Sequence, residues 1–395
     1  MDKESSCTHG DWTSLPNLVS FIIFEKFSKS IDVVQFGLVC KQWYLASKEY
    51  IETKRDIQRK ALPVLLIPTK RGRKKKSRKL YCVIERKFIS EVSVRSNKKF
   101  CGSSHGWIAF NDENGIITLV NPFKNGTTIQ LPRLHIQKKT INYWQDLRKL
   151  VLSEDPSLCP QSFIAVAMFG GYQTIAYIKA GQESWTMIDN GIFNMTLTIF
   201  IDVIFYKGLV YAVTYRGLLV CFDVSQPPPV QVKILVDPGI HESTWKNKVY
   251  LVESSKGELL LVERYYDNWA NWTKTFKVFN LVIDNEDGHL IDKVELKSLD
   301  GDGLFLGQNY SMSISDMNFL ENQRDSIYYT DDFERLSRDH HPGDRDIGIF
   351  RVKDGTRKHL YAYKPSQKYL PPILWIVPPY GFHSCTSALD LKKVM

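Results

Sequence analysis

The sequence of 395 residues lacks any apolar run long enough to cross a lipid bilayer. Its most apolar stretch, residues 193–213, is interrupted by Asp202, Lys207 and Gly208, whereas a spanning helix needs about 20 predominantly apolar residues. The N-terminus also lacks the basic start and apolar core of a secretory signal. These absences predict a protein without membrane contact that works in the nucleus, the cytoplasm or both.

Cysteine is present, but it lacks the arrangement that disulfide frameworks and zinc sites need. The seven cysteines are scattered along the chain, odd in number and without a Cys-x-x-Cys pair. In a chain long enough to form an ordinary hydrophobic core, this pattern favours reduced thiols in the cytosol or nucleus.

Motifs of catalysis are missing as well. There is no Gly-x-Ser-x-Gly nucleophile elbow, no phosphate-binding Gly-Lys-Ser/Thr loop and no His-Glu-x-x-His motif. The acidic segments 284–288 and 300–302 lack the ligand spacing of a calcium-binding loop. His340 and His341 precede a Pro-Gly pair that favours a solvated turn. We expect a non-catalytic protein that binds no cofactor and no metal.

Positive charge is concentrated in one short segment. The formal net charge is +9, and residues 70–79 contain eight basic side chains and no acidic one. Lying between the apolar segments 62–68 and 80–84, this block predicts an exposed, mobile loop that follows a short buried strand. The alternatives are a nuclear localisation signal or a nucleic-acid patch, although no aromatic side chain is interleaved on which bases could stack. The basic residues are Lys70, Arg71, Arg73, Lys74, Lys75, Lys76, Arg78 and Lys79.

The segment from Leu15 to Trp43 predicts a small helical domain. Pro16 suits a first helical turn, and apolar residues then recur at spacings of three and four up to Phe27. Two further amphipathic runs cover residues 31–39 and 40–50. Three short helices cannot bury all of this apolar surface by themselves. We therefore expect the remaining apolar surface to bind a partner.

Both ends of this segment carry a known pattern. Leu15 and Pro16, together with Val-Cys-Lys-Gln-Trp at residues 39–43, resemble the opening and the close of the F-box, over about residues 12–52. The resemblance implies binding to a Skp-type adaptor and, through it, to a cullin. The adaptor contacts expected from it are Leu15, Pro16, Leu18, Ile22, Phe27, Val39, Cys40 and Trp43.

From about residue 80 the pattern changes to short strand-like segments separated by Gly, Asn, Asp and Pro turns. Residues 107–120 predict a hairpin. A shared pattern of an apolar-Val-Tyr strand, a Gly turn and a second apolar strand occurs near residues 205–223 and again near 245–262, with spacings of 39 and 40 residues. A period near 40 in a β-rich chain predicts the blades of a propeller, here six or seven; a β-sandwich or an open two-sheet fold is the alternative. Residues 142–152 instead predict a helical insertion.

A second resemblance covers about residues 80–355. It rests on the segments Ser104–Trp107, Leu119–Phe123, Gly208–Ala212, Leu304–Gly307 and Ile327–Asp332. In order and spacing, these segments resemble plant F-box proteins with a C-terminal region of the domain-of-unknown-function family 295, also described as KIB-like or F-box/kelch-like.

Together these observations predict a mainly β chain with a small all-α N-terminal domain. We expect a disordered N-terminus over residues 1–10, an F-box over 11–55, a linker with the basic loop over 56–79, and a propeller over 80–390. The resemblance implies a substrate-recognition subunit of a Skp–cullin–F-box ubiquitin ligase, whose propeller recruits a target protein. The alternative is a nuclear or nucleic-acid-associated propeller that uses the basic run and has no ligase role. Blade loops vary freely without changing the fold, so the sequence names no target-binding residue.

Overall fold

The structure is a computed structural model of the 395-residue chain, and it separates into two compact units, residues 1–61 and 62–395. The described residues are 12, 15–24, 26, 30–60, 63–68, 76–83, 86–94, 99–112, 114–123, 127–134, 147–169, 174–188, 199–236, 247–267, 272–284, 289–307, 309–315, 323–330, 346–360 and 373–378. The expected disordered segment 1–10 lies outside them.

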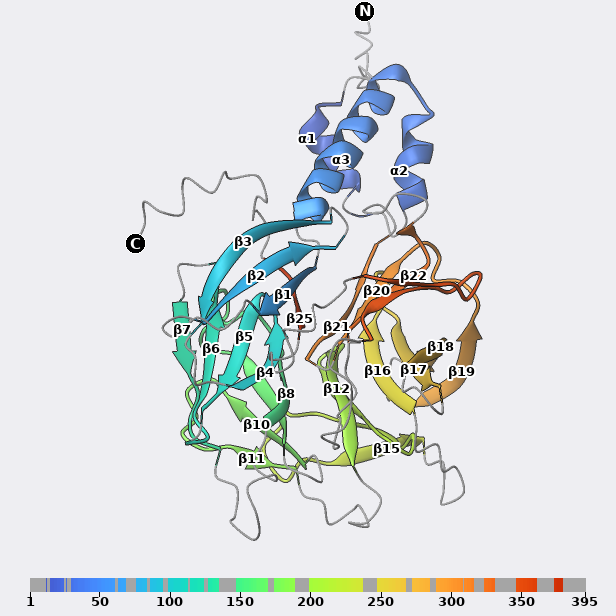
Figure 1. Ribbon diagram of the computed structural model, residues 1–395. Coiled ribbons are helices and arrows are strands. Elements are labelled where there is room, and N and C mark those ends of the chain that lie inside the picture. The colour runs from blue at the N-terminus through green and yellow to red at the C-terminus, as the bar shows by residue number, and fades with distance from the viewer. Residues whose placement is uncertain are drawn as a thin grey trace, which may run out of the picture. The chain divides into compact units, whose positions relative to one another are not determined.

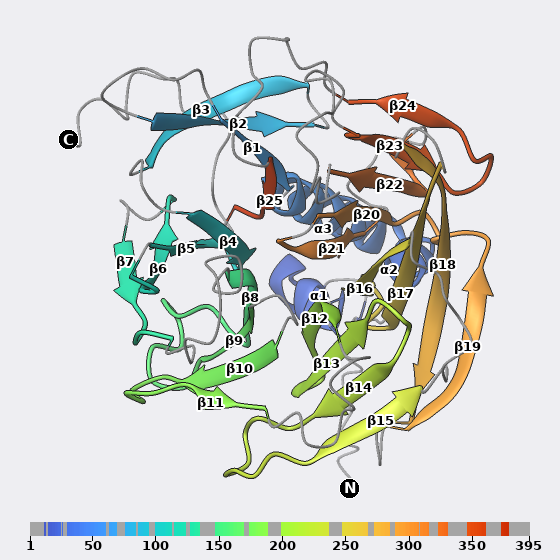
Figure 2. The same ribbon diagram turned by 60° about the horizontal axis from the view of Figure 1, so that its bottom comes forward.

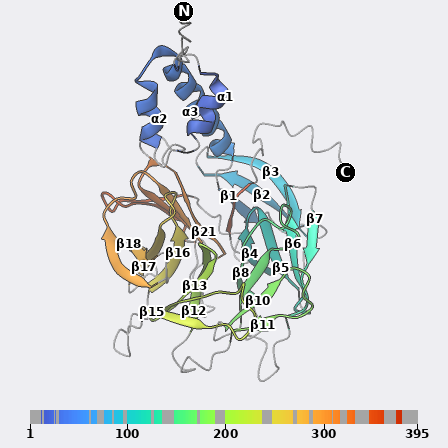
Figure 3. The ribbon, with the colours of Figure 1, turned by 180° about the vertical axis from the view of Figure 1, so that it is seen from behind.

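The first unit contains three helices in its described part: α1 (Asn17–Phe24), α2 (Ser30–Gly37) and α3 (Lys41–Lys60). The carbonyl of Pro16 accepts hydrogen bonds from the amides of Val19 and Ser20, at 2.9 and 3.2 Å, so α1 starts where the sequence predicts. Helix α3 lies between α1 and α2 (Figures 1 and 3). The core between the helices consists of Phe24, Val33, Ala46 and Tyr50, with Phe21 and Phe36 packed against it.

The second unit is a β-propeller. Its described strands form six sheets, so the expected six or seven blades are six. The first sheet joins β1 (Val64–Pro68), β2 (Lys76–Cys82) and β3 (Lys87–Val94) to the C-terminal strand β25 (Leu374–Ile376). The second contains β4 (Lys99–Ser104), β5 (Trp107–Asn111), β6 (Ile117–Asn121) and β7 (Thr127–Gln130). The third contains β8 (Leu147–Leu152), β9 (Ile164–Phe169), β10 (Thr174–Lys179) and β11 (Thr186–Met187).

The remaining sheets continue around the ring. The fourth contains β12 (Phe200–Tyr206), β13 (Leu209–Thr214), β14 (Leu219–Phe222) and β15 (Val232–Val236). The fifth contains β16 (Asn247–Glu253), β17 (Leu259–Tyr266), β18 (Thr273–Ile283) and β19 (Leu290–Leu296). The sixth contains β20 (Gly303–Leu306), β21 (Ser311–Ile314), β22 (Ser326–Tyr329), β23 (Gly348–Arg351) and β24 (Arg357–His359).

The ring is closed by strands from the two ends of the propeller. Strand β25 pairs antiparallel with β1, with Val64 opposite Ile376 and Leu66 opposite Leu374. Figure 2 shows β25 beside β1, with the inner strands of the other blades arranged around the same centre. Closure of this kind leaves a propeller with only short, protected sheet edges.

The sixth blade departs from the simple antiparallel order of the other five. Its chain enters at β20, turns inward to the antiparallel strand β21 and then returns to β22, which runs parallel to β20. The innermost position of this blade is therefore occupied by β21 rather than by the first strand in the chain.

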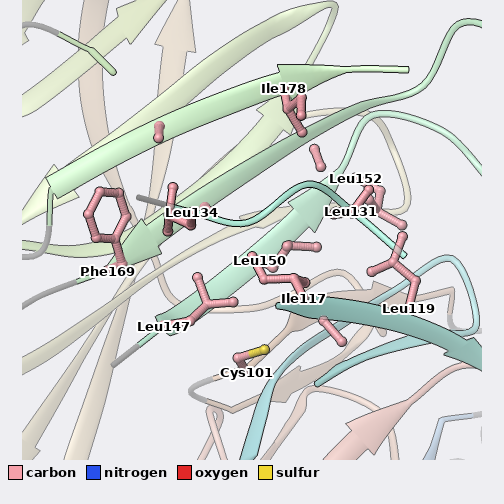
Figure 4. Close-up of a cluster of buried hydrophobic side chains, with 14 of the residues drawn as sticks. Cys101, Ile117, Leu119, Leu131, Leu134, Leu147, Leu150, Leu152, Phe169 and Ile178 are labelled. Atoms are coloured by element: carbon pink, nitrogen blue, oxygen red, sulfur yellow. The ribbon is translucent and has the colours of Figure 1, made fainter. Parts of the chain in front are cut away.

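Hydrophobic clusters between neighbouring blades form the core. One cluster combines residues of the second and third blades, and Figure 4 shows Cys101 and Ile117 facing Leu147 and Leu150. The predicted hairpin contributes to this cluster: β5 and β6 pair antiparallel, and the opposed residues Ala109 and Leu119 are both part of it.

Two expectations about the chain's organisation are wrong. Residues 56–79 are not a linker, because α3 continues to Lys60 while β1 and β2 are strands of the first blade. The propeller unit accordingly begins at Leu62 rather than at residue 80. The expected helix over 142–152 is also wrong where the structure describes it, since residues 147–152 form the inner strand β8.

Candidate binding surface of the helical unit

Helix α1 turns apolar side chains toward solvent. Leu18 is 72% exposed and Ile22 is 56% exposed, and their spacing of four residues places them on one face of the helix. The side chains that enter the core come from other positions, with Ser20 and Phe24 buried. Because burying a Leu or Ile side chain stabilises a protein by roughly 1.5–3 kcal/mol, this face favours a protein partner.

A second apolar group lies at the connection from α2 to α3. Leu38 is 78% exposed and Val39 is 65% exposed. Tyr44 and Leu45, in the first turns of α3, are also largely exposed.

Of the residues that the sequence predicts as adaptor contacts, Leu18, Ile22 and Val39 are exposed, whereas the prediction did not include the exposed Val19, Leu38, Tyr44 and Leu45. A signal was available for α3, where the buried positions Ala46, Ser47 and Tyr50 recur at helical spacing. That spacing places Tyr44 and Leu45 on the solvent side of the helix.

Cys40 and Trp43, both predicted to contact an adaptor, also hold the helical unit together. The Cys40 carbonyl accepts the Tyr44 amide at 2.9 Å, and the Cys40 Sγ accepts the Trp43 amide at 3.4 Å, so Cys40 caps α3. The Trp43 ring stacks on Phe36 with centroids 4.0 Å apart, and its indole N–H donates to the Trp12 carbonyl at 2.9 Å.

The other predicted contact residues differ in exposure. Pro16 is exposed and Leu15 is half-buried, while Phe27 lies outside the described residues.

The basic run is only partly described, and the described part is not a loop. Lys76, Arg78 and Lys79 belong to β2. Arg78 is buried, with its guanidinium 3.9 Å from the centroid of the Phe100 ring, whereas Lys79 is exposed. Arg78 is therefore a packing residue of the propeller, because its long side chain covers an aromatic face. Lys70, Arg71, Arg73, Lys74 and Lys75 lie outside the described residues.

In the described part of the chain, no group of three or more His, Cys, Asp or Glu side chains could hold a metal ion. Nor does any helix within the described ranges have the length and apolar character to span a membrane. The described cysteines, Cys40, Cys82, Cys101, Cys159 and Cys221, form no disulfide.

The fold and this surface define a six-bladed β-propeller protein with an N-terminal three-helix unit that exposes apolar side chains. Residues 77–351 match the KIB1-4 beta-propeller family. The chain belongs to this family, which confirms the resemblance expected from the propeller segments.

Relatives in Arabidopsis thaliana extend the likeness over both units. The chain is 22% identical over 421 residues to "F-box protein SKIP23", covering 93% of this chain and 95% of the relative. It is likewise 22% identical over 424 residues to "F-box protein At2g17036", with the same coverage of 93% and 95%. Among solved structures, the N-terminal domain of Nup159 matches with a TM-score of 0.31 and 7% identity over 73% of each chain. At this TM-score, the likeness supports no conclusion about the protein.

Proposed function

We propose that this protein is a substrate receptor of a Skp–cullin–F-box ubiquitin ligase. In this proposal the helical unit binds a Skp-type adaptor and, through it, a cullin, while the propeller recruits a target protein. The observation that supports it is the pair of exposed apolar groups, on α1 and at the α2–α3 connection, in a small helical unit. The F-box names of the relatives that span both units support the same role.

In this role the protein itself makes and breaks no bond. A receptor accelerates ubiquitin transfer by holding a target lysine near the loaded enzyme, which raises the effective concentration of the reacting groups. The role needs a rigid target-binding unit and a surface for the adaptor, and it requires no catalytic residue in this chain.

The adaptor contact is tested by replacing Leu18 and Ile22 together with alanine. Both side chains are more than half exposed, so the substitutions leave the core of the helical unit intact. We expect the affinity for a purified Skp-type adaptor to fall at least tenfold, because about 0.8 kcal/mol of binding free energy is lost for each CH₂ group no longer buried. The measurement is the dissociation constant by isothermal titration calorimetry.

The matched control is Leu158→Ala, which removes an equally apolar side chain, 76% exposed, from the propeller. This variant should bind the adaptor like the wild type. Equal adaptor binding by the Leu18→Ala/Ile22→Ala variant and the wild type would remove the α1 surface from the proposal.

A further inference from the structure

A pocket of about 350 Å³ lies among the inner strands of the propeller. Five blades contribute to it, through β4, β8, β12, β16 and β21, which Figure 2 shows around the centre of the ring. Its volume falls within the range of roughly 300–1,000 Å³ that is typical of ligand sites. We call it the axial pocket; its polar lining includes Ser104, His105, Glu253, Ser254, Tyr310 and Ser311.

One polar side chain of the axial pocket is buried without a partner. Ser311 is only 5% exposed, and within the described part of the chain its Oγ has no hydrogen-bond partner. A buried hydroxyl in this state costs about 1–3 kcal/mol. A ligand with a hydrogen-bond donor would remove that cost. The hydroxyl of Ser313, by contrast, already has a partner, because it donates to Asp302 at 2.9 Å.

The axial pocket also contains an available carboxylate. Glu253, at the end of β16, is exposed, and among the described residues it forms no ion pair. The cation closest to it in the chain, Lys256, is already paired with Asp300. Burial raises the pKa of Tyr310, and the negative charge of Glu253 raises this pKa further, so the phenol stays neutral beside the carboxylate.

The imidazole of His105 also lines the axial pocket. His105 Nε2 lies 3.3 Å from the carbonyl of Leu152. A carbonyl oxygen only accepts, so Nε2 carries a proton in this contact.

We propose that the axial pocket binds a basic side chain, lysine or arginine, presented by a peptide segment of the target protein. Ammonium and guanidinium groups are donors only. The carboxylate of Glu253 and the hydroxyl oxygen of Ser311 supply a charged and a neutral acceptor for them, and hydrogen bonds to a carboxylate are about twice as strong as neutral ones. The proposal rests on the receptor function insofar as the segment belongs to a recruited target.

The test uses the full-length protein and four pools of fluorescein-labelled pentapeptides, with mixed residues around a central arginine, lysine, citrulline or glutamate. Fluorescence polarisation should show binding of the arginine and lysine pools, and at least tenfold weaker binding of the citrulline and glutamate pools. Glu253→Gln should weaken binding of the basic pools at least tenfold. Glu183→Gln, which removes an exposed carboxylate away from the axial pocket, should leave that binding unchanged.

A second variant tests the Ser311 hydroxyl of the axial pocket without removing a charge. Ser311→Val fills the space of the hydroxyl with methyl groups and should weaken the basic pools, while binding to the adaptor stays at the wild-type value. N-acetyl-arginine amide is the small-molecule arm. If it binds as tightly as the arginine pool, the peptide part of the proposal is wrong.

Equal binding of all four pools, no binding of the basic pools, or full binding by the Glu253→Gln variant would overturn the proposal. None of these results depends on the adaptor. If the wild type binds the adaptor but not the basic peptides, the axial-pocket proposal is wrong and the receptor function is unaffected. If the wild type binds the basic peptides but not the adaptor, the receptor function is wrong and the pocket's preference for basic side chains is unaffected.

Discussion

Arg264 in β17 is a fully buried cation that joins two blades. Its guanidinium donates to Thr273 Oγ1 at 2.8 Å and to the Tyr250 hydroxyl at 3.0 Å within the fifth blade. It also reaches the Thr330 carbonyl at 2.8 Å and the Asp346 carboxylate at 3.1 Å, beside the strands of the sixth. A buried charge is tolerated only when it is paired and hydrogen-bonded in this way.

Replacing Arg264 with methionine should therefore destabilise the propeller strongly. The substitution keeps an apolar side chain in the core but leaves the buried Asp346 carboxylate without its cation. We expect a loss of about 3–5 kcal/mol in the free energy of unfolding, measured by urea denaturation. The control is Arg351→Met, because Arg351 pairs with Asp354 at 3.9 Å on the surface, and such pairs contribute at most about 1 kcal/mol. Equal costs for the two variants would contradict this account.

Buried ion pairs between blades cannot be predicted from local sequence patterns. The Asp202 carboxylate in β12 accepts a hydrogen bond from the buried ammonium of Lys149 in β8. It also accepts one from the amide of Leu251 in β16 at 2.8 Å, so it bridges three inner strands. Its partners lie 53 and 49 residues away, and no local pattern connects them. The sequence marked Asp202 only as a break in an apolar run.

At the scale of elements, the period near 40 residues correctly predicted blades but matched the wrong strands. Val210 lies in β13, the second strand of its blade, whereas Val249 lies in β16, the first strand of the next. The two hairpins look alike because each turns through a glycine with positive φ, 86° at Gly217 and 75° at Gly257, a conformation that glycine adopts without strain. Which strand of a blade a segment forms depends on its pairing with strands distant in sequence, and a local repeat does not encode that pairing.

The strand β8 shows why the expected helix was wrong. Leu147, Leu150 and Val151 recur at spacings of three and four, as in a helix. The strand is instead buried on both sides, including Lys149, so it shows no alternation of polar and apolar residues. Runs buried on both faces cannot be distinguished from helices by periodicity alone.

The candidate surface was predicted where the motif and helical periodicity coincide, and missed where they do not. Leu18 and Ile22 follow Leu15 and Pro16 at helical spacing and are exposed. Leu38 immediately precedes the 39–43 motif and is also exposed, but its exposure depends on how α2 ends, which the motif does not specify.

The close approach of α2 and α3 depends on Gly37. A Cβ atom at this position would lie 2.3 Å from Ser47 Oγ and 3.2 Å from Ser47 Cβ. We expect Gly37→Ala to cost about 1–3 kcal/mol through overpacking, although alanine favours helices more than glycine does. Thermal unfolding of the helical unit, followed by circular dichroism in the full chain, measures the cost.

Adding Ser47→Ala to Gly37→Ala removes the nearest clashing atom and should restore part of the lost stability. Without restoration, the cost would have to arise elsewhere than at this helix contact, and the packing argument would be wrong.

At the scale of the whole molecule, one short strand connects the first blade to both of its neighbours. In β25, the Trp375 indole donates to the Leu306 carbonyl of β20 at 2.9 Å, and its ring contacts Phe305 at 5.0 Å between centroids. The Trp375 carbonyl accepts Ser103 Oγ of β4 at 2.6 Å and Asn309 Nδ2 at 3.0 Å. Because β25 also pairs with β1, these contacts close the ring across a very large separation in sequence.

Replacing Trp375 with alanine should open the ring locally as well as lower its stability. The lost packing of a buried tryptophan costs about 3–5 kcal/mol, and the loosened β25 would leave β1 as an exposed sheet edge. Hydrogen exchange in native buffer should therefore rise in a peptide covering Val64–Pro68. Trp107→Ala is the matched control, because Trp107 is equally buried and also donates one hydrogen bond, to Asp155 at 2.7 Å, but lies in β5 of the second blade. Its exchange should rise around β5 while β1 stays protected. If β1 exchanges at the same rate in both variants, β25 is not what closes the ring.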